Sequence, residues 1–315
     1  MKILQGLLIT AGAAALVCLL AAYICFRLAF YADRRPETEE YPLPKGEEYE
    51  PYRDMMIGWM KEVRAMDCQE LEITSFDGLK LRAKYYEYAP GAPIELMFHG
   101  YRGTSERDLC GGVQRCFALG HSAFIVDQRA SGTSEGNVIT FGINERRDCL
   151  SWVDFLIGHF GPGVRIILTG ISMGAATVTM AAGQALPKNV IGILADCGYT
   201  SAKEMILKTI GEMGLPARPL YPFVKLGARL FGHFDLEETS PLEAAAHCTV
   251  PAIFFHGEAD AFVPCAMSRR NFEACPTRKA LVTIPGAAHG LSYPADPDTY
   301  LNALREFYGA TTAIK

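Results

Sequence analysis

The sequence lacks the features of a nucleic-acid-binding protein. Its 315 residues contain no block of basic side chains interleaved with aromatics, and the formal net charge of −5 is mildly acidic. Proteins that bind nucleic acid neutralise phosphates with clustered Lys and Arg. We therefore expect no nucleic-acid partner.

The ten cysteines also lack a regular pattern. No Cys-x-x-Cys pair occurs, and scattered cysteines are more typical of free thiols in a reducing setting than of designed disulfides. No cluster of His, Cys, Asp or Glu has the spacing of metal ligands. We expect no metal and no other cofactor.

Polar residues are almost absent near the N-terminus. From Gly6 to Phe26 the only polar side chain is Thr10. A helix of this length is roughly 30 Å long, which matches the hydrocarbon core of a bilayer. The run predicts a single transmembrane anchor within residues 1–32.

A cleaved signal peptide is the alternative, because small residues occur at 13–15 and 21–22. The apolar run exceeds the roughly 7–15 residues of a signal-peptide core, which favours a retained anchor. Lys2 precedes the run and Arg27 follows it, with Arg34 and Arg35 beyond. The positive-inside rule places the C-terminal part in the cytoplasm, whereas the short basic head argues for the opposite. The side of the membrane stays open.

Small residues surround one serine in Gly170-Ile171-Ser172-Met173-Gly174. An apolar run typical of a buried strand precedes it, over residues 164–169, and a small-residue run typical of a helix follows over 175–182. A serine on a tight strand-to-helix turn between glycines is a nucleophile elbow. The pattern predicts that Ser172 is a catalytic nucleophile.

A serine nucleophile needs a base, and the base needs an orienting acid. Asp260 follows the apolar strand 251–256, and His289 follows the strand 280–284. The order serine, acid, histidine is the one expected after such an elbow. We predict a Ser172, Asp260 and His289 triad. Glu258 and Asp196 are alternatives for the acid.

An oxyanion hole completes this chemistry. The strand 94–98 runs into His99-Gly100-Tyr101, whose backbone can approach a substrate closely at the glycine. We predict that the backbone N–H groups of Tyr101 and Met173 stabilise the oxyanion.

These segments resemble the α/β-hydrolase superfamily, in particular its membrane-anchored esterase-like and serine-aminopeptidase-like members. The resemblance spans residues 94–290 and is carried by His99-Gly100-Tyr101, Asp127 to Ser134, the Ser172 pentapeptide, Phe255 to Pro264 and Ala288-His289-Gly290. It implies an eight-stranded, mostly parallel sheet with helices on both faces and a Ser-His-Asp hydrolase site. Ala130 departs from the glycine of many relatives, in a loop that is structural in the family.

The remaining chain divides around this core. Residues 33–52 are acidic and rich in proline, which predicts a semi-stiff linker that holds the catalytic domain off the membrane. Alternating strands and helices predict one doubly wound α/β domain over 53–315. Residues 199–248 are too long for an ordinary crossover and predict a helical lid over Ser172. Phe223 and Leu226 are candidate substrate-binding residues within it; alternatively, the segment only completes the core.

The leading hypothesis is a membrane-bound serine hydrolase that acts on small or lipid-like carboxylic esters. A peptidase or thioesterase of the same fold is the alternative within this chemistry, and a peptidase should hold a substrate amine with acidic groups such as Glu204 or Glu212 in the lid. A non-catalytic binding module is the third hypothesis. Such a chain should lack a member of the triad.

Overall fold

The computed structural model describes residues 2–33 and 38–312. Within these residues, one eight-stranded sheet has the order β1-β2-β4-β3-β5-β6-β7-β8. β1 and β2 pair antiparallel, β2 pairs antiparallel with β4, and all other neighbours are parallel. The expected eight-stranded, mostly parallel α/β sheet is confirmed. The strands are β1 Gln69–Thr74, β2 Lys80–Tyr86, β3 Ile94–Phe98, β4 Ser122–Asp127, β5 Ile166–Ile171, β6 Val190–Asp196, β7 Ala252–Gly257 and β8 Lys279–Ile284.

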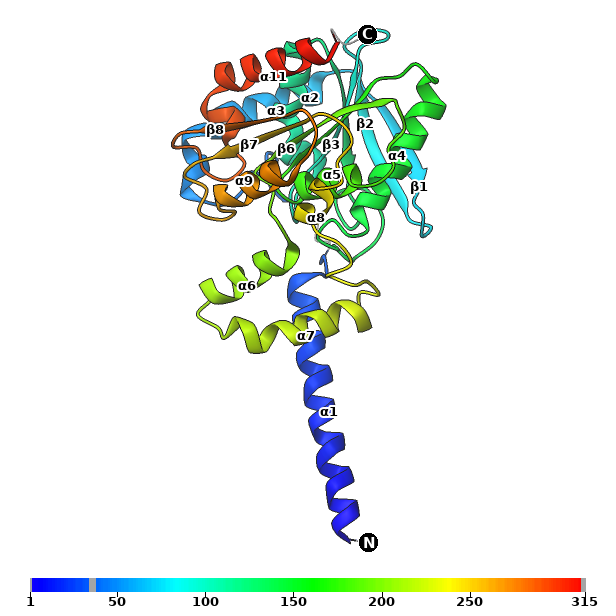
Figure 1. Ribbon diagram of the computed structural model, residues 1–315, viewed down its shortest axis with the longest axis vertical. Helices are drawn as coiled ribbons and strands as arrows, with labels where there is room; N and C mark the ends of the chain where they lie inside the picture. The colour runs from blue at the N-terminus through cyan, green and yellow to red at the C-terminus, as the bar shows by residue number, and fades with distance from the viewer. Residues whose placement is uncertain (1, 34–37, 313–315) are drawn as a thin grey trace.

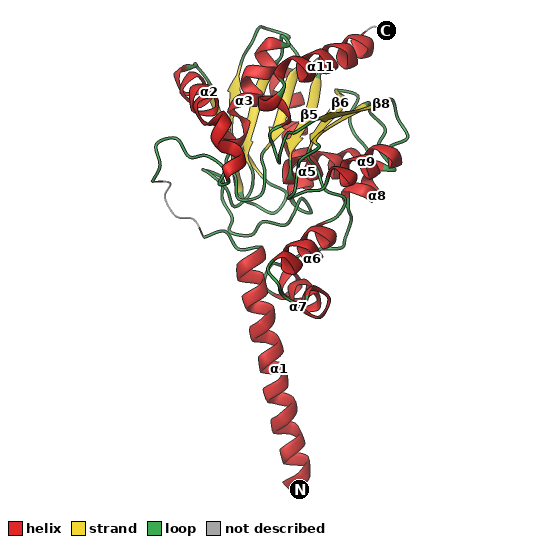
Figure 2. Ribbon diagram, turned by 90° about the vertical axis from the view of Figure 1, so that its left-hand side faces the viewer, coloured by secondary structure: helices red, strands yellow, loops and turns green. Residues whose placement is uncertain are grey.

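Helices cover both faces of this sheet (Figure 2). One face carries α2 Arg53–Ala65, α3 Ser105–Ala118 and α11 Pro297–Thr312; the other carries α4 Glu145–Phe160, α5 Met173–Ala182 and α9 Cys265–Ala274. Shorter helices are η1 Glu47–Tyr52, α8 Pro241–Ala245 and α10 Ser292–Ala295. Because both faces are buried, the central strands are mostly apolar. Glu95 of β3 is a buried exception, and its carboxylate is paired with Arg115 at 2.5 Å.

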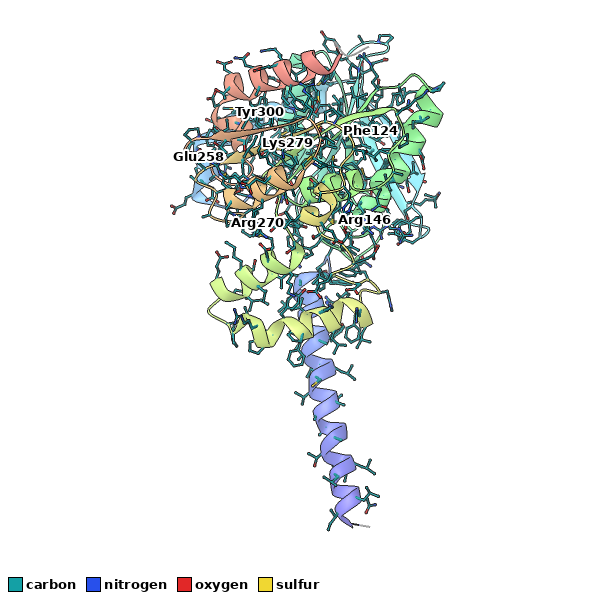
Figure 3. The ribbon with its side chains drawn as sticks, viewed as in Figure 1. Phe124, Arg146, Glu258, Arg270, Lys279 and Tyr300 are labelled. Atoms are coloured by element: carbon teal, nitrogen blue, oxygen red, sulfur yellow. The ribbon has the colours of Figure 1, made fainter. Side chains whose placement is uncertain are left out.

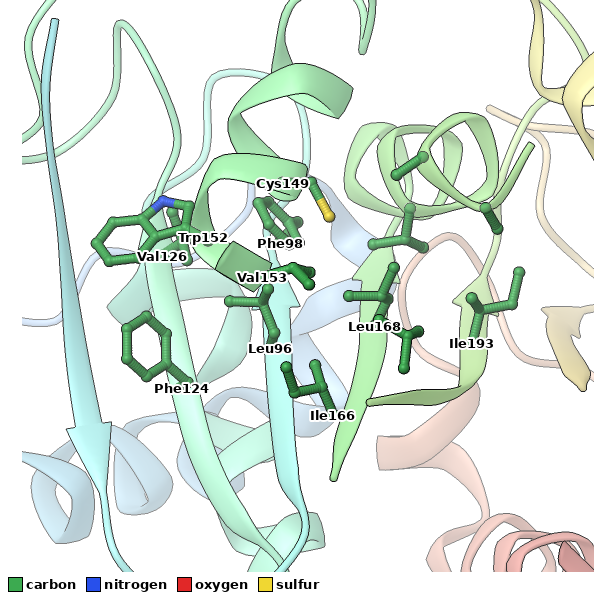
Figure 4. Packing of buried hydrophobic residues seen from close by; sticks show 14 of the residues in the cluster. Leu96, Phe98, Phe124, Val126, Cys149, Trp152, Val153, Ile166, Leu168 and Ile193 are labelled. Atoms are coloured by element: carbon green, nitrogen blue, oxygen red, sulfur yellow. The ribbon is translucent and has the colours of Figure 1, made fainter. Parts of the chain in front are cut away.

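Alternation along the strands divides the core between these two faces. Leu96 and Phe98 of β3 pack with Trp152 of α4, whereas Met97 between them packs with α3 on the opposite face. Figure 4 shows Leu96, Phe98 and Trp152 in one packed layer with Leu168 of β5. The sheet is thereby held rigidly, and its C-terminal strand ends form a firm base for loops.

The N-terminal apolar run forms one long helix, α1 Lys2–Ala29. Every residue from 3 to 20 is exposed, and the side chains of this part point outward on all sides of the helix (Figure 3). Eighteen residues at about 1.5 Å each make about 27 Å, close to the thickness of a bilayer core. By length and composition this helix is long and apolar enough to cross a membrane.

The last two turns of α1 pack on the rest of the protein. Ala22, Phe26 and Phe30 are buried at four-residue intervals, which places them on one side of the chain. The rings of Phe141 and Phe234 contact Phe30 edge-on, with centroids 5.7 and 5.2 Å away. The expectation that the linker separates this helix from the domain is therefore wrong, because the end of the apolar segment contacts the domain directly.

Residues 199–248 contain the helices α6 Ala202–Glu212 and α7 Ala217–Leu230. These two helices lie apart from the main body, and α7 crosses α1 (Figure 1). A Cβ on Gly227 of α7 would overlap the Ala22 carbonyl, so the glycine lets the two helices approach closely. The buried face of α7 carries Tyr221, Val224 and Ala228. The segment is thus a helical pair that packs on α1, and its role as a lid over Ser172 stays a prediction.

The linker also differs from a free spacer in its described part, 33 and 38–52. Tyr41 and Leu43 pack against the cluster of α2 and α3, and residues 47–52 form η1. Tyr49 of η1 donates a hydrogen bond to the backbone oxygen of His289 at 3.0 Å. The proline-rich composition hid these contacts, because only a few aromatic and apolar side chains make them.

The docking of α1 predicts unequal effects of two substitutions, one immediately after this helix and one within it. Phe30→Ala removes a fully buried ring and should cost about 3–5 kcal/mol, which lowers the melting temperature by several degrees. Leu20→Ala, on the exposed part, should leave it unchanged. Thermal unfolding of the detergent-solubilised full chain measures both. Equal melting temperatures for the two variants would show that α1 does not pack on the domain.

Candidate active site

The turn around Ser172 joins β5 to α5 with almost no free space. A Cβ on Gly170 would overlap the backbone of Gly174, and a Cβ on Gly174 would overlap the Phe98 carbonyl. Ser172 itself has φ 56° and ψ −116°, a conformation that side-chain-bearing residues rarely adopt. Strain of this kind persists only where the surroundings impose it, and it is common at functional sites.

Three side chains meet at this turn in a continuous hydrogen-bonded chain. His289 Nε2 lies 2.8 Å from Ser172 Oγ, and His289 Nδ1 lies 2.7 Å from Asp260 Oδ2. The structure therefore brings together the three residues expected to form the triad. With the proton on Nδ1, the imidazole donates to the carboxylate and faces the serine hydroxyl with its free lone pair.

The loop after β7 fixes the Asp260 carboxylate. Its Oδ1 accepts hydrogen bonds from the backbone N–H groups of Phe262 and Val263, at 2.9 and 2.8 Å. Burial alone would raise the pKa of Asp260, but hydrogen bonds from His256 and His289, together with the charge of His289, lower it to about 2. Asp260 consequently stays ionised at any pH at which esters are normally assayed.

His256 is a member of this site that the sequence interpretation missed. It is fully buried at the end of β7, and its Nε2 lies 3.1 Å from Asp260 Oδ2 and 2.8 Å from the Val263 carbonyl. A proton on Nε2 serves both acceptors, and Nδ1 then accepts from the Ser268 hydroxyl at 2.7 Å. The signal in the sequence that could have found it is its position near the end of the strand, four residues before Asp260.

The two alternative acids have other partners. Asp196 is buried and accepts hydrogen bonds from the hydroxyls of Ser292 and Tyr300, and burial raises its pKa. Glu258 accepts from Thr283 at the exposed edge of the domain, where Figure 3 labels it. Within the described part of the chain, neither carboxylate makes a hydrogen bond to His289.

The loop after β3 lies beside Ser172. Asp108 accepts a hydrogen bond from the Gly100 N–H at 3.0 Å, and a Cβ on Gly100 would lie 3.5 Å from the Ser172 Cβ. Among the described residues, the backbone N–H groups of Tyr101 and Met173 have no hydrogen-bond partner. Both are free to bind an oxyanion, which is the role expected of them.

The lid residues expected to bind substrate are placed differently from the other site residues. Phe223 and Leu226 are half-buried, and neither belongs to the apolar cluster that contains Tyr101 and Met173. Members of that cluster from the lid include Met205 and Tyr221 instead. The role of Phe223 and Leu226 stays a prediction.

A small cavity borders the site. Its volume is about 60 Å³, and Ile171 and Gly290, the neighbours of Ser172 and His289, contribute to its lining with Trp59 and Tyr293. Ligand pockets usually measure about 300–1,000 Å³, so a large acyl group needs a rearrangement of the surrounding segments. A groove of about 990 Å³ lies beyond the β3 loop, and its lining includes none of the three triad residues.

One group of possible metal-binding side chains occurs among the described residues. Donor atoms of Cys197, Asp260 and His289 lie within 4.8 Å of one another. The Asp260 and His289 atoms already bond each other, and burial raises the pKa of the Cys197 thiol well above its usual value. A neutral thiol is a poor metal ligand, so this arrangement suits proton transfer better than metal binding.

Comparison with known proteins gives distant relatives. No family model matches the chain. The uncharacterized protein YqkD of Bacillus subtilis (strain 168) is 29% identical over 190 residues, which are 60% of this chain and 62% of that protein. The matched region thus covers less than two thirds of that relative's length.

Solved structures match a larger share of the chain. The Pyrococcus furiosus esterase Pf2001 has a TM-score of 0.65 and 20% identity, covering 85% of this chain and 96% of its own. The alpha/beta hydrolase GrgF from Penicillium sp. has a TM-score of 0.62 and 17% identity, and the match covers 79% of this chain and 100% of that protein. A puromycin-hydrolyzing peptidase of Mycobacterium tuberculosis has a TM-score of 0.59 and 19% identity, and the match covers 78% of this chain and 39% of that protein. At these identities the likeness establishes the fold.

The choice of acid is testable by three matched amide substitutions. Asp260→Asn removes the charge that holds the His289 tautomer and should lower kcat about 10⁴-fold. Asp196→Asn and Glu258→Gln should retain most of kcat, because their partners lie outside the hydrogen-bonded chain. Steady-state ester hydrolysis by each purified, folded variant measures this. A crippled Asp196→Asn beside an active Asp260→Asn would transfer the role to Asp196.

Proposed function

The chain has the α/β-hydrolase fold, and we propose that it is a membrane-anchored serine hydrolase that cleaves carboxylic esters. The single observation that supports this best is the unbroken chain from Asp260 through His289 to Ser172, with both histidine nitrogens at hydrogen-bond distance. A non-catalytic binding module has no need of this arrangement.

In the proposed mechanism, Ser172 Oγ attacks the ester carbonyl carbon and its proton passes to His289 Nε2. The carbonyl oxygen becomes an oxyanion and is stabilised by the N–H groups of Tyr101 and Met173. The bond to the leaving alkoxide breaks as His289 returns the proton to it. Water then attacks the acyl-enzyme carbonyl, gives its proton to His289, and Ser172 Oγ leaves with that proton.

The two lid carboxylates considered for a peptidase already have cationic partners. Glu204 is paired with Arg270 at 2.8 Å and also accepts a hydrogen bond from Thr200, and Glu212 is paired with Lys208. A substrate amine would have to compete with these partners. This observation favours an ester over a peptide with a free amino group.

Membrane anchoring by α1 is the second part of the proposal. It is supported by the exposed apolar stretch of about 27 Å, which continues as one helix into the docked turns at Ala22 and Phe26. Alkaline carbonate extraction of membranes tests the anchor. Release of the intact chain into the supernatant would overturn it, and a mature N-terminus beyond residue 20 would identify a cleaved signal peptide.

Ser172→Ala should abolish reaction with a fluorophosphonate probe and lower ester turnover by roughly 10⁴-fold or more, because the triad acts as a unit. The hydrogen bond that the hydroxyl makes is the one to His289, so we expect little change in the melting temperature. Gel-based probe labelling and ester hydrolysis measure the two activities. Substantial turnover by the folded variant would exclude Ser172 as the nucleophile.

A substrate panel tests the ester preference and the lid together. We expect turnover of p-nitrophenyl esters to rise with acyl length from acetate to a medium chain, since each buried methylene contributes about 0.8 kcal/mol at best. Aminoacyl p-nitroanilides and acyl thioesters in the same assay address the alternatives. Phe223→Ala and Leu226→Ala should shift the preferred length if these residues line the acyl site. Faster cleavage of the anilides would identify a peptidase.

A further inference from the structure

The loop that carries the proposed oxyanion donor is bound to the end of the anchor helix. The Tyr101 hydroxyl donates to the Ala29 carbonyl at 2.8 Å. The Arg102 guanidinium donates to the carbonyls of Leu28, at 2.8 Å, and Tyr31, at 3.2 Å. Two neighbouring residues of the catalytic loop thus hold three carbonyls at one end of α1.

These bonds meet a need of the helix. The last carbonyls of an α-helix have no partner within it, and the helix dipole makes this end negative. A guanidinium and a hydroxyl from the loop satisfy the carbonyls of Leu28 and Ala29. The positive charge of Arg102 is also favourable at this end, which strengthens the contact.

The same bonds constrain the loop. Arg102 has a φ of 54°, in the left-handed region that costs a side-chain-bearing residue about 1 kcal/mol or more. A contact must hold the residue there, and the Arg102 guanidinium bonds the end of α1 and lies 5.1 Å from the centroid of the Tyr101 ring. On the opposite side, Gly100 is held by Asp108. Tyr101 lies between these two attachment points.

Ring packing joins the same two elements a second time. The Tyr101 ring lies 5.1 Å from that of Phe141, and the Phe141 ring lies 5.7 Å from that of Phe30. Phe30 is fully buried immediately after α1. A shift of the helix end therefore displaces the Tyr101 side chain through packing as well as through hydrogen bonds.

We propose that the end of α1 positions the oxyanion loop, with the Tyr101 hydroxyl and the Arg102 guanidinium as positioning groups. The anchor is then a working part of the active site rather than only an attachment to the membrane. This inference rests on the proposed serine hydrolase function. Its consequence is that the backbone N–H of Tyr101 stays oriented toward the oxyanion position only while α1 is docked.

The test removes the two contacts without touching the triad. Tyr101→Phe deletes one oxygen, Arg102→Met deletes the donors, and the double variant combines them in the full chain in detergent. We expect the double variant to lose about 10- to 100-fold in kcat per active site, less than the loss of a whole oxyanion donor. The KM for p-nitrophenyl butyrate should stay within about twofold, because the ground-state ester does not use the hole.

An inhibitor gives a reading specific to the oxyanion. Ser172 Oγ adds to the carbonyl carbon of pentyl trifluoromethyl ketone, its proton goes to His289, and the ketone oxygen becomes an oxyanion. We expect the inhibition constant of this ketone to rise by the factor by which kcat/KM falls. The concentration of active sites is measured by fluorophosphonate titration. A loss of folded protein therefore does not lower the kcat calculated per active site.

Two controls complete the design. Tyr23→Phe removes a hydroxyl from the same helix, where the ring contacts Phe231 and not the loop, and should leave kcat unchanged. Arg102→Lys restores a donor and should recover part of the loss. If the double variant is too unstable to purify, Tyr101→Phe alone gives the comparison.

One outcome is a double variant that has the same kcat and the same inhibition constant as an active wild-type enzyme. That result would overturn the positioning role and leave the hydrolase function standing. A wild type that neither reacts with the fluorophosphonate nor hydrolyses any ester overturns both.

Discussion

The close contact of α5 with the end of β3 is the constraint on which the site depends. Gly174 lies so near the Phe98 carbonyl that no side chain fits between the helix and the strand. Ser172 is consequently held in its strained conformation, directly beside the loop that follows β3. Ser172 and the backbone N–H of Met173 next to it are therefore placed by the packing of two rigid elements.

The anchor helix contributes a second constraint, which acts on the loop rather than on the serine. Ala22, Phe26 and Phe30 pack on α7 and on the domain, while the preceding part of α1 remains exposed. The helix is therefore exposed over most of its length and buried against the protein at its end. The carbonyls of Leu28 and Ala29 at that end are satisfied by side chains of the loop after β3, so the docking of α1 and the geometry of this loop are physically coupled.

Much of the fold could be predicted from the sequence because the relevant signals are local. Apolar runs identified the strands β3, β5, β7 and β8 that precede the site loops. The glycines around Ser172 identified the elbow from a steric need that the structure reproduces. The order of Asp260 and His289 after the elbow was enough to select both residues as partners of Ser172, and the structure places the three side chains in contact. At Ala130 the φ of 62° is one that glycine adopts more easily, so alanine is the more strained residue at this position.

The contacts that were not predicted are non-local and carried by few residues. The buried stripe of Ala22, Phe26 and Phe30 is invisible in a helix that is apolar on every side, because no polar face marks the opposite surface. Tyr49 lies in a segment whose proline and acid content is typical of a linker, and its single bond to His289 leaves no pattern. Phe223 and Leu226 were selected for hydrophobicity, which does not distinguish the two sides of α7.

The two candidate acids show how backbone geometry distinguishes similar residues. Both Asp196, the last residue of β6, and Asp260, in the loop after β7, are buried carboxylates. Hydroxyls of Ser292 and Tyr300 occupy both oxygens of Asp196, and burial raises its pKa. Two backbone N–H groups occupy only one oxygen of Asp260 and leave the other for the histidines. The loop after β7 thus keeps a charged carboxylate oxygen free to orient His289, which the environment of Asp196 does not.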